Sequence, residues 1–177
     1  MSLGTWIFNI FLILLYFVTG FYITQCSVYL NNYTSSDVNI ATAYKYAFSA
    51  SFIPWTLLGI FIVVLAGFII VTVQTGGADL KAAQQSALKS GGWATIFFII
   101  MLVLITITGI LSAAAAHNIG ISSTYAGGNA DVALAYRDAI ISASVCIGIV
   151  ILIIGALIYL YWQSRQPEEI KETKTVQ

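Results

Sequence analysis

The side chains that could carry chemistry are few, and their spacing does not form a reaction centre. His117 is the single histidine among 177 residues, and the two cysteines, Cys26 and Cys146, stand far apart in the chain. Zinc sites usually need three or four His, Cys or carboxylate ligands, and none of the common phosphate-binding, metalloprotease or nucleophile motifs occurs. The sequence therefore predicts a protein that is not an enzyme, without metal or cofactor. We interpret His117 as an interfacial residue; the alternative is a pH sensor or a single ligand.

Two cations, Lys45 and Arg137, form the other candidate site, because they occupy corresponding places in two similar segments. One interpretation is a paired cationic site at the outer mouth of a pore. The other is a pair of solvated or snorkelling charges, with Arg137 beside its neighbour Asp138. We favour the second interpretation, because charge costs little at the depth where water is present.

The composition is that of a membrane protein. Hydrophobic residues make up 59% of the chain and charged residues 8%, whereas a soluble domain carries about 25% charged residues. Seven basic and seven acidic residues give a net charge of zero, which predicts no nucleic-acid partner. A membrane-spanning helix needs about 20 apolar residues, and four stretches free of Asp, Glu, Lys and Arg qualify: residues 6–24, 52–73, 93–116 and 139–162.

Four spans place both termini and the middle loop on the same side of the membrane. That side carries most of the basic residues (Lys81, Lys89, Arg165, Lys171 and Lys174). The positive-inside rule therefore predicts that the termini and the middle loop are cytoplasmic or on the equivalent inner side. The first outer loop contains the sequon Asn32-Tyr33-Thr34, which makes Asn32 a candidate for glycosylation.

The chain contains an internal repeat, because residues 33–51 align without gaps with residues 125–143. Upstream, Thr19-Gly20 resembles Thr108-Gly109. A repeated unit of two spans predicts two parallel copies related by a pseudo-twofold axis along the membrane normal. The identical pairs in the aligned segment are Tyr33/Tyr125, Ala41/Ala133, Ala43/Ala135, Tyr44/Tyr136 and Ala47/Ala139.

The repeated segments also predict where two helices begin. Asp37 and Asn129 are good N-caps, because their side chains accept hydrogen bonds from exposed helix N–H groups. The second and fourth helices would then begin before their apolar spans and project beyond the outer membrane surface. The predicted organisation is a first hairpin at 1–75 (spans at about 6–25 and 38–73), an inner loop at 76–92, a second hairpin at 93–162 (spans at about 93–116 and 130–162) and a polar C-terminal tail at 163–177.

Small residues within the spans are candidates for helix contacts, since lipid gives apolar helices no hydrophobic drive to associate. We expect them to pack the four-helix bundle; contact between copies in a homo-oligomer is the alternative. The candidate helix-packing residues are Gly59, Gly67, Gly109, Ala113, Ser144, Gly148 and Gly155.

The sequence thus predicts an all-α membrane protein, a four-helix bundle made from a duplicated hairpin. Uncharged spans and missing reaction motifs favour a structural or assembly subunit of a larger complex in an organelle, respiratory-type or virion membrane. The expected partners are the lipid bilayer and other protein subunits or further copies of this chain. The alternative is an oligomeric channel or small transporter.

Overall fold

The computed structural model describes residues 3–35, 37–75 and 92–164, and this part of the chain is helical apart from short turns. Four of its helices are long and apolar enough to cross a membrane, which confirms the predicted all-α, four-span architecture. The predicted inner loop and polar tail lie, apart from their edge residues, outside the described residues. The helices are α1 (Leu3–Asn31), α2 (Val38–Thr75), α4 (Gly92–Gly120), α5 (Ser123–Ala126) and α6 (Ala130–Ser164).

The long helices follow from the apolar spans, because a chain in lipid must satisfy its backbone N–H and C=O groups internally. Helices α2 and α6 begin at Val38 and Ala130, next to the predicted caps. Helices α1 and α4 continue to Asn31 and Gly120, several residues beyond the apolar spans expected from hydropathy. No proline or glycine interrupts residues 26–31, so α1 extends up to the turn.

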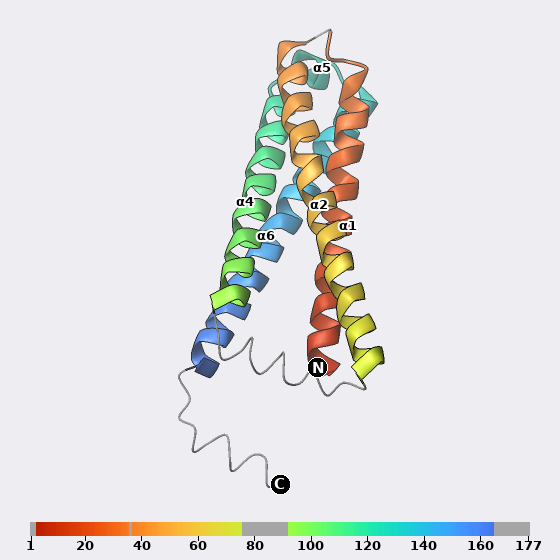
Figure 1. Cartoon of the computed structure of the whole chain (residues 1–177). Helices are drawn as coiled ribbons and strands as arrows, with labels where there is room; N and C mark the ends of the chain where they lie inside the picture. The colour runs from red at the N-terminus through yellow and green to blue at the C-terminus, as the bar shows by residue number, and fades with distance from the viewer. Residues whose placement is uncertain (1–2, 36, 76–91, 165–177) are drawn as a thin grey trace.

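The four long helices pack in a ring, in which α1 contacts α2, α2 contacts α4, α4 contacts α6, and α6 contacts α1. We call the end with the connections at residues 32–37 and 121–129 the loop end. The opposite end, where α1 begins and α6 finishes, is the terminal end. Figure 1 shows the helices close together at the loop end and the two hairpins, α1/α2 and α4/α6, diverging toward the terminal end.

The bundle has two buried clusters of different composition. The loop-end cluster is rich in alanine, with Ala43, Ala47, Ala135 and Ala139 fully buried among larger residues. Small side chains let helix backbones approach closely. The second cluster, toward the terminal end, is made mostly of larger side chains: Leu12, Tyr16, Leu57, Leu58, Met101, Ile105, Cys146, Ile149 and Ile153. The small side chains thus lie at the end where the helices are close together, and the larger ones lie toward the end where the hairpins diverge.

The outward surface of the spans is apolar, as contact with lipid requires. Large aliphatic and aromatic side chains are exposed on all four long helices. Examples from each long helix are Phe11 and Leu14, Ile62 and Val63, Val103 and Ile110, and Ile147 and Ile151.

Candidate functional site

Asp37 joins the two connections at the loop end. Its Oδ1 accepts a hydrogen bond from the backbone N of Asn39 (2.8 Å), so the predicted N-cap of α2 is confirmed. Its Oδ2 accepts two hydrogen bonds from Ser123 in α5, one from the backbone N (2.9 Å) and one from the hydroxyl (2.8 Å). These hydrogen bonds to Asp37, with that from Ser123 first, hold the pKa of the carboxyl group below its usual value.

A second hydrogen bond joins the two hairpins at the loop end. Here the first hairpin supplies the donor, whereas Asp37 supplies an acceptor. The hydroxyl of Tyr33 donates to Oδ2 of Asp131 in the first turn of α6 (2.8 Å). The predicted cap of α6 is also confirmed, because Oδ1 of Asn129 accepts hydrogen bonds from the backbone N of Asp131 (3.0 Å) and of Val132 (3.1 Å). The loop end is therefore fastened by side chains that come from both hairpins.

Arg137 makes an ion pair with its chain neighbour Asp138, at 2.8 Å between Nη2 and Oδ1. The Arg137 side chain is 58% exposed, whereas that of Asp138 is 3% exposed. The carboxylate thus points into the bundle and its guanidinium partner reaches the surface. This ion pair agrees with the interpretation that Asp138 neutralises the charge of Arg137. The pairing reduces the net positive charge that is available to bind an anion.

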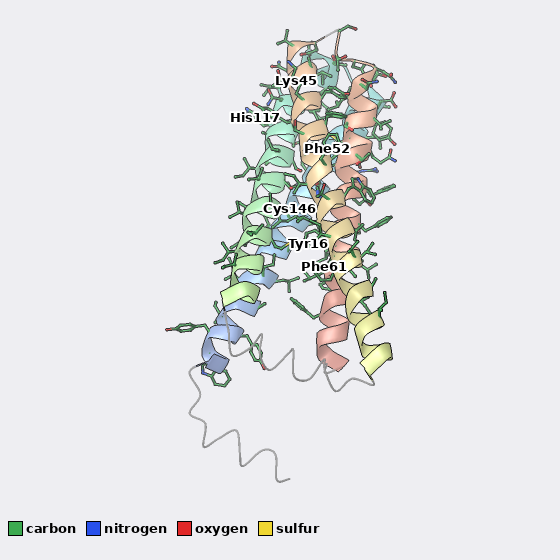
Figure 2. All side chains as sticks on the ribbon, in the orientation of Figure 1. Tyr16, Lys45, Phe52, Phe61, His117 and Cys146 are labelled. Carbon is green, nitrogen blue, oxygen red and sulfur yellow. The ribbon has the colours of Figure 1, made fainter. Side chains whose placement is uncertain are left out.

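The other candidate polar residues are separated from one another. Lys45 and His117 are both exposed, in the loop-end halves of α2 and α4 (Figure 2). Lys45 and Arg137 belong to α2 and α6, which lie across the diagonal of the ring rather than side by side. Asn32 is exposed in the turn after α1, so its side chain is accessible for the predicted glycosylation. The outer-mouth site and the glycosylation remain predictions.

The small residues divide into two groups. A Cβ atom added to Gly109 would lie 3.1 Å from Cβ of Cys146 on α6, which makes this glycine a close helix contact. At Gly59, Gly67, Gly148 and Gly155 the space around an added Cβ is open to 4 Å, so these positions make no close contact with another helix among the described residues. Close approach also occurs at Gly20, where an added Cβ would lie 3.1 Å from the Trp55 ring.

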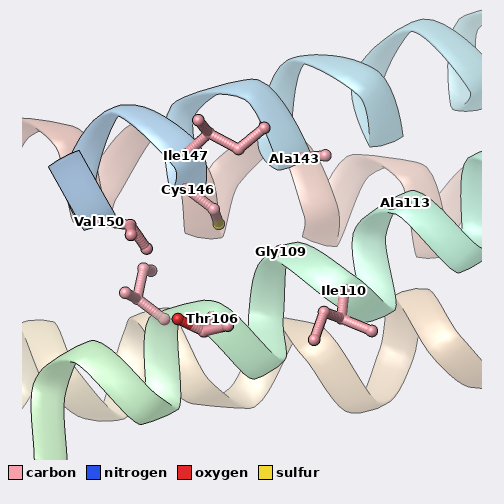
Figure 3. A pocket seen from close by; sticks show the side chains of 9 residues that line it. Thr106, Gly109, Ile110, Ala113, Ala143, Cys146, Ile147 and Val150 are labelled. Carbon is pink, nitrogen blue, oxygen red and sulfur yellow. The ribbon is translucent and has the colours of Figure 1, made fainter.

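Gly109 and Ala113 share a shallow groove between α4 and α6 (Figure 3). The groove has a volume of about 320 Å³, and its walls include Ile147 and Val150. The Thr106 hydroxyl donates to the backbone O of Leu102, so it is already satisfied within its own helix. The predicted small-residue positions Gly109 and Ala113 thus line an apolar groove on the outer surface of the bundle. Ser144 is exposed, and its hydroxyl donates to the backbone O of Ile140 in its own helix.

Several polar side chains are buried inside the bundle. The hydroxyls of Thr19 and Thr108 donate to backbone oxygens four residues earlier, at 2.9 and 3.1 Å. Ser112 and Ser142 share a hydrogen bond of 3.1 Å between α4 and α6. The hydroxyl of Tyr16 is also buried, and among the described residues it has no hydrogen-bond partner.

Both thiols are buried as well: Cys26 belongs to the loop-end cluster and Cys146 to the cluster nearer the terminal end. Neither forms a disulfide in the part of the chain that the structure describes. Their positions at different levels agree with the expectation from sequence that they are separate, apolar cysteines.

Sequence reasoning missed the buried carboxylate of Asp138, because the fourth apolar span was drawn from residue 139 onward. The structure buries Asp138 together with Ala135, three residues before it, and Ser142, four residues after it. That spacing places all three side chains on the same face of a helix. The interhelical role of Asp37 was also missed, since only its capping role follows from local sequence.

No protein-family model matches this sequence, and no significant match is found among curated proteins or solved structures.

Proposed function

We propose that this chain is a non-catalytic, multi-pass membrane protein that acts as a structural or assembly subunit of a larger membrane-associated complex. The observation that carries the proposal is the fastening of the loop end by Asp37–Ser123 and Tyr33–Asp131. A surface held by side chains from both hairpins is preorganised, which lowers the cost of ordering a partner interface. The alanine-rich cluster directly beneath gives this surface a rigid support.

The proposal includes the duplicated architecture expected from the repeat. A pseudo-twofold axis would relate the α1–α2 contact to α4–α6, and the α2–α4 contact to α6–α1, and these are the four contacts of the ring. Thr19 and Thr108 make the same local hydrogen bond, and Asp37 and Asn129 cap corresponding helices. In this arrangement the loop end lies on the outer side, where the candidate spans Ile10–Asn31 and Val38–Val63 have their ends.

Purification under gentle conditions tests the assembly role. The full chain, carrying a C-terminal tag, would be extracted into nanodiscs from its own membrane, and the intact particles analysed by mass spectrometry. We expect a fixed stoichiometry with other subunits or with further copies of the chain. In the double variant Tyr33→Phe with Asp37→Ala, the loop-end links are removed, and we expect these partners to be lost while the protein remains in the membrane. A strictly monomeric particle that contains lipid alone contradicts the proposal.

A channel or small transporter is the second candidate, and the observation that favours it is the divergence of the two hairpins toward the terminal end (Figure 1). Beyond Phe61, the side chains of α2 that the structure describes are exposed, as Val63 is at 71%. A bundle closed at one end and wide at the other is compatible with alternating access. Flux of ions or neutral solutes through purified protein in liposomes would support this candidate and count against a purely structural role.

A further inference from the structure

A groove between α1 and α2, in the loop-end half of the bundle, differs in character from the apolar groove between α4 and α6. Its volume is about 470 Å³. One wall is a row of aromatic side chains on α2, and the rim is formed by two amides at the end of α1. The residues that carry the argument are Tyr44, Phe48, Phe52, Trp55, Asn31 and Asn32.

The aromatic side chains of this wall contact one another along the helix. The rings of Tyr44 and Phe48 are stacked with centroids 5.7 Å apart, and Phe48 meets Phe52 edge to face at 5.0 Å. At the bottom of the row, Nε1 of Trp55 donates to the hydroxyl of Thr24 on α1 at 3.0 Å, which fixes the indole across the helix pair. Because this wall is formed before a ligand arrives, binding has a smaller ordering cost.

The aromatic wall is nevertheless uncovered. Phe48 is 46% exposed and Phe52 56% exposed, although both stand in a groove rather than on a convex surface. Tyr44 and Trp55 are eleven positions apart, a rise of about 16 Å along the helix. That length is roughly half of the 30 Å hydrocarbon core, so the groove is as long as one leaflet is deep.

The polar end of the groove is neutral. Asn31 and Asn32 line it, and their side-chain amides make no hydrogen bond with the rest of the described chain. An amide both donates and accepts hydrogen bonds, as a hydroxyl does. The described residues that line the groove include no charged side chain, so the lining offers no ionic partner to a phosphate head group.

We propose that this groove binds a neutral membrane lipid of the sterol class, with a flat fused-ring body against the aromatic wall and its single hydroxyl at Asn31 and Asn32. A rigid ring system matches a rigid wall and loses little conformational freedom on binding, whereas an acyl chain would be ordered at a greater cost. The proposal does not depend on the assembly role, since a lipid site on α1/α2 is compatible with either candidate function.

Photolabelling of the purified full chain in phosphatidylcholine nanodiscs tests the site, with a photoactivatable sterol as the probe. We expect labelled peptides from residues 24–32 and 44–55, and competition by unlabelled sterol. The double variant Phe48→Ala with Phe52→Ala is expected to reduce labelling roughly tenfold, since two large apolar contacts are lost. The matched control is Ile140→Ala with Ile151→Ala, which removes two exposed apolar side chains from α6 and should leave labelling unchanged.

A second comparison tests recognition of the head group. Asn31→Leu with Asn32→Leu should weaken labelling by the hydroxylated probe but not by a probe whose hydroxyl is capped as a methyl ether. All four positions are exposed or at the rim, so thermal stability should stay within a few degrees of the parent and report intact folding. Labelling spread evenly over four helices overturns the proposal. So does an acyl-chain photoprobe that labels the groove as selectively as the sterol probe.

Discussion

The loop-end half and the terminal half of the bundle are built differently, although both consist of apolar helices. At the loop end, fully buried alanines such as Ala43 and Ala135 bring the helices together, and Asp37 and Tyr33 fasten the connections. Toward the terminal end, large side chains fill the interior and the hairpins diverge (Figure 1). In a lipid environment, where burial of apolar surface drives little association, close packing and hydrogen bonds decide which end is tight.

Replacement of a buried alanine by a larger residue should produce the largest difference in stability between the two halves. Ala43→Leu inserts three carbon atoms into the fully buried loop-end cluster, and overpacking of a core typically costs about 1–3 kcal/mol. We expect a marked drop in the unfolding midpoint of the detergent-solubilised protein. Ala66→Leu is the matched control, because Ala66 is exposed in the terminal half of α2. Equal destabilisation by both substitutions would remove the distinction between the two halves.

Glycine substitutions should separate close contacts from open positions. Gly109→Ala places a Cβ 3.1 Å from Cβ of Cys146, so α4 or α6 must shift by a few tenths of an ångström. Gly148→Ala meets open space and removes a flexible residue from a helix interior, which is worth about 1 kcal/mol in favour of the helix. We expect Gly109→Ala to lower the unfolding midpoint and Gly148→Ala to leave it unchanged or raise it. If Gly148→Ala lowered the unfolding midpoint and Gly109→Ala did not, Gly109 would not be the close helix contact.

The placement of these glycines also marks the limit of what the sequence predicts. The four long helices and the caps Asp37 and Asn129 follow from apolar length and local hydrogen bonding, and the structure confirms them. Which face is buried does not follow, because interior and lipid-facing residues are equally apolar and the helices carry no amphipathic signal. The prediction of helix packing at Gly59 and Gly148 rests on small residues and their spacing, such as Ser144-x-x-x-Gly148, and these patterns do not show which face meets another helix. The close approach at Gly20 is not predicted for the same reason.

Long-range polar contacts could not be predicted from the sequence either. The contact of Asp37 with Ser123 joins residues far apart in the chain, and nothing local to either residue names the other. The burial of Asp138 could not be predicted either, because the sequence does not show that the helix face it shares with Ala135 and Ser142 is the buried one.

Acid should weaken the loop end through Asp37. The pKa of Asp37 in the folded protein is below its unfolded value of 3.8, because the carboxylate accepts hydrogen bonds from Ser123 and Asn39. Its stabilising contribution is therefore present above that unfolded value and is lost as the pH falls through the lower folded pKa. In Asp37→Asn the amide oxygen can still cap α2, but the amide NH2 group cannot accept the hydrogen bond from the backbone N of Ser123. The substitution should therefore cost about 1 kcal/mol at pH 7, as the loss of one hydrogen bond does, and less near pH 3.

Thermal unfolding of the parent and of Asp37→Asn at pH 7 and pH 3 measures this difference. Val38→Ala is a suitable control, since Val38 is exposed beside the cap and makes no use of the carboxylate. A gap between parent and Asp37→Asn that does not shrink in acid would mean that the charge of Asp37 is not what fastens the loop end.

The smallest effect, with the opposite sign, is expected at Tyr16 in the cluster nearer the terminal end. Its hydroxyl is buried, and within the described chain it has no hydrogen-bond partner, whereas Tyr33 at the loop end donates to Asp131. An unsatisfied buried hydroxyl costs about 1–3 kcal/mol, and its removal by a substitution of the same shape can be neutral or stabilising. Tyr16→Phe should therefore leave the unfolding midpoint unchanged or raise it slightly, while Tyr33→Phe should lower it. If Tyr16→Phe lowers the midpoint as well, the Tyr16 hydroxyl has a partner in the membrane-embedded protein, and the wider half is held by a polar contact in the same way as the loop end.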